Sequence, residues 1–85
     1  MNKYVFTILP AIFNAPRGTE YDEVEHKKLN EDLEKIRILI MANDMKEGLE
    51  KGKHELQLII AANFNDMQGI GNYVFRLRVI EIQNY

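Results

Sequence analysis

The sequence has no cysteine, no serine and only two histidines. Without cysteine the chain can form neither disulfides nor thiolate metal sites, and the sequence does not indicate whether the protein belongs to an oxidising or a reducing compartment. Without serine, hydroxyl catalysis of the triad kind would need Thr7 or Thr19, and neither has a histidine partner evident in the sequence. We therefore expect a protein that is not an enzyme and that carries no metal or cofactor.

Long apolar runs and a strong charge of one sign are also missing. No segment approaches the roughly 18 apolar residues that a membrane span needs. Eleven Lys plus Arg face 13 Asp plus Glu, a net charge of −2, which disfavours generic DNA binding. Lys3 before an apolar stretch resembles the start of a signal peptide, but Pro10 interrupts the stretch, and a first strand over residues 3–9 fits it better. We expect a soluble, cytoplasmic protein.

The chain is short, and its 85 residues make a single domain, residues 1–85. A domain of this size buries only about 60% of its unfolded surface, which leaves a small stability margin. Such chains often gain stability from disulfides, metals or association. Because cysteine is absent, we expect a homo-oligomer, with a dimer favoured.

A helix is predicted after a loop over residues 14–18. Thr19 followed by Asp22 resembles a capping box, so the helix should begin near Glu20. It should end near Lys35. Apolar residues at spacings of four, three and four predict one buried stripe, made of Leu29, Leu33, Ile36 and Ile40.

Residues 36–51 leave two alternatives open. The helix could continue, or residues 36–42 could form a strand, followed by a turn at Asn43 and Asp44 and a short helical turn over residues 45–51 that Gly52 ends. We favour the strand, because three isoleucines alternate there. A single helix to Lys51 would also be about 48 Å long, which is too long for so small a domain.

The last third of the chain predicts a β-hairpin. Two alternating runs, residues 54–64 and 73–83, flank a polar loop with glycines, residues 65–72. Setting Phe64 opposite Tyr73 gives one wholly apolar face. The reverse face is mixed, and a face that merely met water should be polar. Its apolar residues are therefore expected to lie under a helix or a second subunit, and they are the predicted oligomer interface: Ile59, Val74, Ile80 and Ile82.

Together these elements predict a small α+β domain in the order strand, helix, strand, strand, strand. One helix would lie across a mainly antiparallel sheet of about four strands, which ends in the C-terminal hairpin. Because the helix separates the first two strands, that pair would be parallel if the strands were adjacent.

The best polar candidates for a ligand site are Arg76 and Arg78, which would lie about 7 Å apart on one face of a strand. The alternative is an ion pair with a nearby carboxylate, that of Glu55, Glu31 or Glu34. Met67 and Ile70 are apolar residues of the loop, and they either fold back onto the core or protrude to contact a partner.

Other patterns carry weaker signals. The glycines at positions 69 and 71 lack the full fingerprint of a phosphate-binding loop and precede no predicted helix. His26 lies one turn after Asp22, a spacing at which the two side chains can share a metal. On the polar side of a charged helix, however, His26 is expected to be solvated, and His54 is expected at the surface.

We therefore expect a non-enzymatic binding protein that acts through a surface or a subunit interface. Compact chains of this kind are common among accessory and inhibitor proteins of phages and mobile elements, which bind a host protein or sequester an anionic small ligand. The alternative is a nucleic-acid-associated regulator, whose binding would weaken steeply with salt. Its local basic patch would consist of Arg17, Lys27, Lys28, Arg37, Arg76 and Arg78.

Overall fold

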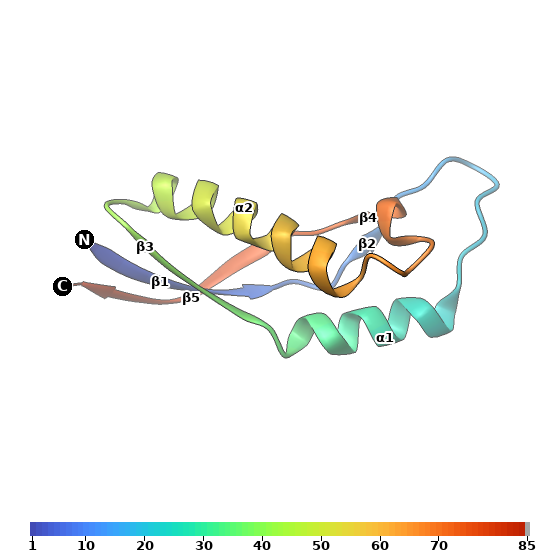
Figure 1. Cartoon of the computed structure of the whole chain (residues 1–85), viewed down its shortest axis with the longest axis horizontal. Coiled ribbons are helices and arrows are strands. Elements are labelled where there is room, and N and C mark those ends of the chain that lie inside the picture. Colours follow the sequence, from blue (N-terminus) through green and yellow to red (C-terminus); the bar gives the residue numbers. More distant parts are fainter. Residues whose placement is uncertain (85) are drawn as a thin grey trace.

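The computed structural model describes residues 1–84 and confirms the predicted α+β class (Figure 1). In these residues, a three-stranded antiparallel sheet and a two-stranded ribbon are accompanied by two α-helices rather than the predicted one. Neither helix in this part of the chain has the length and hydropathy required to cross a membrane. In chain order, the elements are β1 (Asn2–Ile8), β2 (Ile12–Phe13), α1 (Glu23–Glu34), β3 (Arg37–Ala42), α2 (Met45–Asn63), the 3-10 turn η1 (Ile70–Asn72), β4 (Tyr73–Val74) and β5 (Leu77–Asn84).

Strand β1 lies at the centre of the three-stranded sheet, whose order is β3-β1-β5, and it runs antiparallel to both neighbours. The predicted first strand is confirmed, but the parallel pairing expected for the first two strands is wrong. The chain continues from β1 through β2, turns, and comes back along α1 before it forms β3 (Figure 1). The helix is therefore part of the return path, and β3 runs back along β1.

The two faces of the sheet differ. Tyr4, Phe6 and Ile8 alternate along β1, are buried, and lie on the inner face, which α2 covers. A Cβ atom added to Gly48 of α2 would touch Tyr4, and one added to Gly52 would touch Phe6. The hydrophobic core includes this inner face and extends to α1 and β4. It consists of Tyr4, Phe6, Ile8, Ala11, Leu29, Leu33, Ile38, Ala42, Leu56, Phe64 and Tyr73.

Helix α1 begins a few residues later than predicted, because Asp22 rather than Thr19 is its N-cap. The Asp22 carboxylate accepts hydrogen bonds from the backbone N–H groups of Val24 and Glu25, both at 3.0 Å. The Thr19 hydroxyl instead donates to the carbonyl of Pro16 at 2.6 Å. The loop before the helix therefore has a turn of its own.

The end of α1 agrees with the prediction. Lys35 is the C-cap and β3 follows almost directly, so the strand alternative for residues 36–42 is confirmed. Leu29 and Leu33 of the predicted stripe are almost completely buried. Ile36 and Ile40 lie beyond the helix, and both pack against the core.

The predicted C-terminal hairpin is wrong, because residues 54–64 do not form a strand. They belong to the second half of α2, which also absorbs the short helical turn predicted over residues 45–51. The segment is rich in Leu, Gln, Glu and Ala, residues that favour a helix. Leu56 is buried, whereas Leu58, which the hairpin register assigns to the core face, is 52% exposed. A helix accounts for this difference, and one face of a strand does not.

Gly52 does not end the helix, contrary to the prediction. Gly48 and Gly52 lie on the side of α2 that meets the sheet. A Cβ atom at Gly48 would lie 3.0 Å from Cδ2 of Tyr4. One at Gly52 would lie 3.1 Å from Cδ1 of Leu77 and 3.3 Å from Cε2 of Phe6. The two glycines therefore permit a close approach of helix and sheet.

The last predicted strand, residues 73–83, is extended but divided in two. Its first residues form β4, which pairs with β2, and the remainder forms β5, which pairs with β1. This segment thus pairs with β1 and β2 near the N-terminus and not with residues 54–64. Ile80 is an inserted bulge residue, because Val79 lies opposite Phe6 while Glu81 lies opposite Val5.

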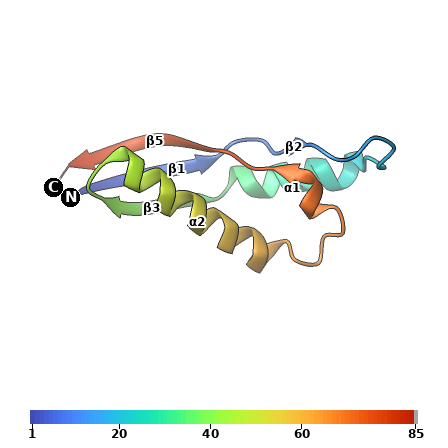
Figure 2. The same cartoon turned by 90° about the horizontal axis from the view of Figure 1, so that it is seen from above.

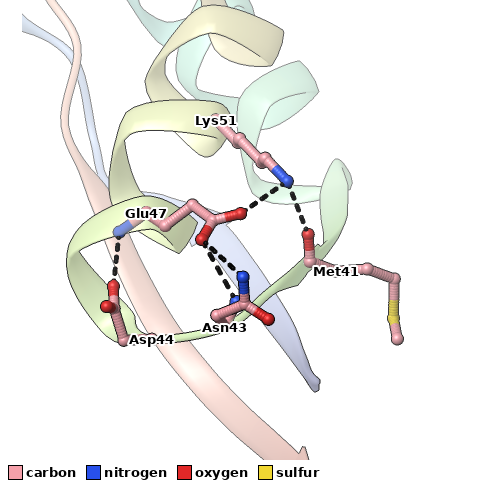
Figure 3. Close-up of polar contacts among 5 residues, drawn as sticks. All are labelled: Met41, Asn43, Asp44, Glu47 and Lys51. Carbon is pink, nitrogen blue, oxygen red and sulfur yellow. Dashed lines mark hydrogen bonds and ion pairs between the residues drawn. The ribbon is translucent and has the colours of Figure 1, made fainter.

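A polar cluster joins the end of β3 to the start of α2 (Figure 3). Asp44 is the N-cap of α2 and accepts from the backbone N–H of Glu47 at 2.9 Å. The Glu47 carboxylate accepts from Lys51 at 2.9 Å and from the backbone N–H of Asn43 at 3.4 Å. Lys51 also donates to the carbonyl of Met41 at 3.1 Å. The hydrogen bond from Lys51, and to a smaller extent the one from Asn43, lowers the pKa of Glu47 below its ordinary value.

Candidate binding groove

Helix α2 covers the inner face of the sheet unevenly. It packs mainly against β3 and less against β1. Figure 2 shows that it crosses the sheet obliquely, so that its C-terminal half runs away from β5. A groove with a volume of about 860 Å³ remains between α2 and the segment that leads into β5, residues 73–77.

The groove has a helical wall and an extended wall. On α2, the lining residues recur at helical spacing and therefore share one side of the helix: Leu49, Lys53, Leu56, Gln57, Ile60 and Ala61. The facing wall is formed by Tyr73, Phe75, Arg76 and Leu77, together with Leu9, which follows β1. Ile70 and Gly71 of η1 complete the lining.

Most of this lining is apolar and only partly covered. Leu56 and Tyr73 are buried in the core. Other apolar residues pack against the core but keep part of their surface exposed, and a ligand that covers this surface gains free energy. These half-buried residues are Leu49, Ile60, Phe75 and Leu77.

The charged residues of the groove are all cationic. Lys53 on α2 and Arg76 on the facing wall line it, and no Asp or Glu does, although the chain has more acidic than basic residues. Both cationic side chains are exposed. Within the described part of the chain, neither forms an ion pair or a side-chain hydrogen bond. The groove thus combines an apolar lining with unpaired positive charge.

The two arginines predicted as ligand residues have different surroundings. Arg76 lies between β4 and β5, where its carbonyl accepts from the backbone N–H of Leu9 at 2.9 Å, and it lines the groove. Arg78 lies opposite Thr7, on the other face of the sheet from Phe6, and does not line the groove. Among residues 1–84, neither arginine forms the ion pair with a carboxylate that was the alternative interpretation. The groove therefore brings Arg76 together with Lys53.

Met67 and Ile70 fold back rather than protrude. Both are half-buried and pack against the core. Ile70 lines the groove, whereas Met67 lines a smaller cavity between α1 and the end of α2. Of the two predicted contact residues in the loop, only Ile70 belongs to the groove.

The four predicted interface residues do not share a face, because the hairpin face that was to hold them does not exist. Ile59 is on α2 and packs partly buried against the core. Val74 is on β4. Ile80 and Ile82, on β5, are 50% and 49% exposed.

The outer face of the three-stranded sheet is a further exposed apolar surface, which the hairpin prediction missed. Leu39 lies opposite Val5 and is 58% exposed, and Met41 follows it on the same face of β3. Ile80 on β5 is also 50% exposed, but as the bulge residue it interrupts the alternation of faces along that strand. The alternation within residues 36–42 is the sequence signal for this surface.

His26 is half-buried, and the prediction that it is solvated is wrong. Its ring lies near those of Tyr21 and Tyr73, with centroid distances of 5.1 and 5.4 Å. The amide nitrogen of Asn30 donates to Nε2 at 3.1 Å, and the amide oxygen accepts from the backbone N–H of Ala11 at 2.7 Å. This network assigns the ring proton of His26 to Nδ1, which is buried without a hydrogen-bond partner.

The surroundings of His26 favour a structural role. In the described residues, no group of three or more His, Asp and Glu side chains is placed to hold a metal ion. Asp22, the predicted neighbour of His26, is engaged as the N-cap of α1. Burial raises the pKa of the Tyr73 phenol, and Tyr21 raises it further, so this phenol is neutral at neutral pH. His54 is exposed, as predicted.

The chain matches no protein-family model and has no significant match to a curated protein or to a solved structure. Its function is therefore inferred from the geometry of the groove and of the exposed surfaces.

Proposed function

We propose that this protein is a non-enzymatic binding protein that takes an apolar ligand into the groove between α2 and residues 73–77. The observation that carries the proposal is the groove itself. Its volume of about 860 Å³ lies in the range of about 300–1,000 Å³ that is typical of small-molecule sites. Among residues 1–84, the lining contains no carboxylate, histidine, serine or threonine, which supports binding rather than catalysis.

The half-buried lining sets the scale of the affinity. A linear alkyl chain laid along the groove would remove about six methylene groups from water at about 0.8 kcal/mol each, or about 5 kcal/mol in total. This gain is a gross value, and the translational and rotational freedom lost on association opposes it, so the dissociation constant is expected to be no tighter than about 0.1 mM. Because a helix and a hydrogen-bonded strand segment form the walls, little further ordering opposes binding.

Titration of ¹⁵N-labelled protein with dodecanol tests this proposal. We expect saturable chemical-shift changes along the lining side of α2 and in residues 73–77. Ala61→Trp, which fills the groove, should weaken binding about five-fold or more by displacing buried methylene groups. Ala62→Trp is the matched control, because Ala62 is an exposed neighbour outside the lining. Shift changes spread over the whole surface, or equal effects of the two variants, would contradict the proposal.

A second candidate role is self-association through the free edge of β5. This strand lies at the edge of the sheet and exposes Ile80 and Ile82, and an edge strand offers unpaired backbone groups to a second copy. On the other edge strand, β3, the Met41 carbonyl already accepts from Lys51, a charged residue of the kind that protects edges. The dimer stays a prediction, and β5 is the edge that we propose for it.

Two further expectations also stay predictions. Binding of a host protein, as expected of a phage accessory or inhibitor protein, would use the groove or the β5 edge. Nucleic-acid binding would need the predicted basic residues to act together, but they are distributed over the loop before α1, α1, β3, the link to β5, and β5. Lys27 shares a surface cavity with Glu31 and Glu34, which offset its charge. A steep loss of binding with salt would favour nucleic acid.

A further inference from the structure

We propose that the ligand of the groove is a long-chain carboxylate, held at its charged end by Lys53 and Arg76 and along its chain by the apolar lining. This inference rests on the proposed function, because it names the chemical class that the groove takes. Its basis is the charge of the lining. Two cations line opposite walls, and none of the described residues contributes a carboxylate, in a chain with 13 acidic against 11 basic residues.

Lys53 and Arg76 are available to a ligand. Both are exposed and unpaired among the described residues, whereas the nearby Lys51 is engaged with Glu47 and with the Met41 carbonyl. A ligand carboxylate supplies the charge that the lining lacks. The planar guanidinium of arginine can bind it through two parallel hydrogen bonds, and lysine acts on it as a point charge.

A neutral donor accompanies the cation on the helical wall. Gln57 lies four residues after Lys53, on the same side of α2, and also lines the groove. Its amide N–H can donate to a carboxylate oxygen that the cations leave free. The helical wall therefore presents two donors one turn apart, and neither has a hydrogen-bond partner among the side chains of residues 1–84.

The remaining lining excludes a ligand with several charges. Leu56, Ile60 and Phe75 have no polar side-chain atoms and cannot solvate a second charged group. From Lys53 to Ala61, α2 rises about 12 Å, so the apolar stretch is long enough for an alkyl chain. A single anionic head on a linear apolar tail matches both parts of the lining. A nucleotide or a dicarboxylate matches only the cations.

The test compares three probes that share one chain and differ in head group: dodecanoate, dodecanol and dodecyltrimethylammonium. The two ionic probes are kept below their critical micelle concentrations and dodecanol below its solubility limit. Calorimetric titration should show dodecanoate binding about ten-fold more tightly than dodecanol, because charge-assisted hydrogen bonds form only with the acid. Dodecyltrimethylammonium should bind most weakly, since its charge is repelled by both cations.

Variants identify the groups that hold the head. Lys53→Gln and Arg76→Gln should each weaken dodecanoate binding about three-fold, the size expected of an exposed ion pair, and should weaken dodecanol binding less, because the alcohol carries no charge. Arg78→Gln is the matched control, because Arg78 is an exposed arginine outside the groove. All three positions are on the surface, and thermal unfolding checks that each variant is folded.

The outcomes separate this inference from the proposed function. Equal affinity for dodecanoate and dodecanol overturns the carboxylate proposal and leaves groove binding in place. Failure of all three probes to bind overturns both. Binding to vesicles of anionic phospholipid without binding to free dodecanoate overturns the inference in favour of a lipid headgroup at a membrane surface.

Discussion

Replacement of Gly48 by alanine tests how closely α2 packs on the sheet. A Cβ atom at this position would lie 3.0 Å from Cδ2 of Tyr4 and 3.3 and 3.4 Å from two further atoms of the same ring. Tyr4 is buried on the central strand, so its ring cannot move away without disturbing the packed core. The new methyl group therefore has to be accommodated by a shift of helix or strand.

Two effects oppose each other in this variant. In a helix interior, alanine is favoured over glycine by about 1 kcal/mol. Overpacking of a core costs about 1–3 kcal/mol, so a middle value leaves a net loss of about 1 kcal/mol. For a domain of this size, such a loss lowers the Tm by about 4–8 °C. On an exposed helical turn, the same replacement would be neutral or stabilising. A decrease in stability therefore indicates close packing of α2 on the sheet, and an increase indicates an exposed site.

Denaturant unfolding of Gly48→Ala, Tyr4→Leu and the double variant measures the contact directly. Tyr4→Leu removes the ring, so in that background Gly48→Ala should stabilise the protein by up to about 1 kcal/mol. The packing of α2 on β1 would be refuted if Gly48→Ala were more stable than wild type, or if its effect were the same in both backgrounds.

Three further predictions concern the Asn30 hydrogen bond, the cap of α2 and the edge of β5. Asn30→Ala leaves the backbone N–H of the buried residue Ala11 without its acceptor. It should lower the free energy of unfolding, measured in urea, by about 1–3 kcal/mol. An unchanged urea midpoint would argue against that hydrogen bond. The pKa of Glu47 is lowered by folding, so its contribution to stability is present above the ordinary value of 4.5 and is lost as the pH falls through the lowered value. Glu47→Gln should therefore flatten the acid limb of the stability curve, and an unaltered slope would contradict this. Ile82→Glu should weaken the dimer, as measured by sedimentation, whereas Leu58→Glu, at a similarly exposed position on α2, should not. A wild-type protein that is monomeric at micromolar concentration would exclude the β5 edge as an interface.

The N-terminal half of the fold can be predicted from the sequence, because local signals and tertiary packing agree there. Pro10 bounds the first strand, and the alternating isoleucines of residues 36–42 form a strand with its inner face in the core. The small error at the start of α1 arises because two residues, Thr19 and Asp22, are both good caps. Only the structure shows that Asp22 is the one that caps the helix.

Residues 54–64 could not be assigned from alternation alone. Leu56, Leu58 and Ile60 alternate as in a strand, but Leu56 and Ile60 are also four residues apart, and short apolar runs of this kind fit both periods. The deciding signal lies further upstream. Asp44 and Glu47 have the spacing of a capping box, and Glu47 and Lys51 that of an i,i+4 ion pair, which together favour one helix from Met45 onward.

The groove could be predicted only in part. Arg76 and Ile70 are candidates from the sequence, and both line it. Lys53 is missed, because its position in the groove depends on the helix over residues 45–63, which the prediction cut short at residue 51. Once residues 45–63 are helical, Leu49, Lys53 and Leu56 fall on one side of α2, which places a lysine beside the apolar lining of the groove. The oblique placement of α2, which opens the groove, arises from tertiary packing.

The most direct test of groove binding is an NMR titration of the labelled protein with dodecanoate. We predict saturable shift changes that are largest at Lys53, Ile60, Phe75 and Arg76, and that Ala61→Trp reduces while Ala62→Trp does not. A titration without saturation, or shift changes centred on outer-face residues such as Leu39, would contradict binding in the groove.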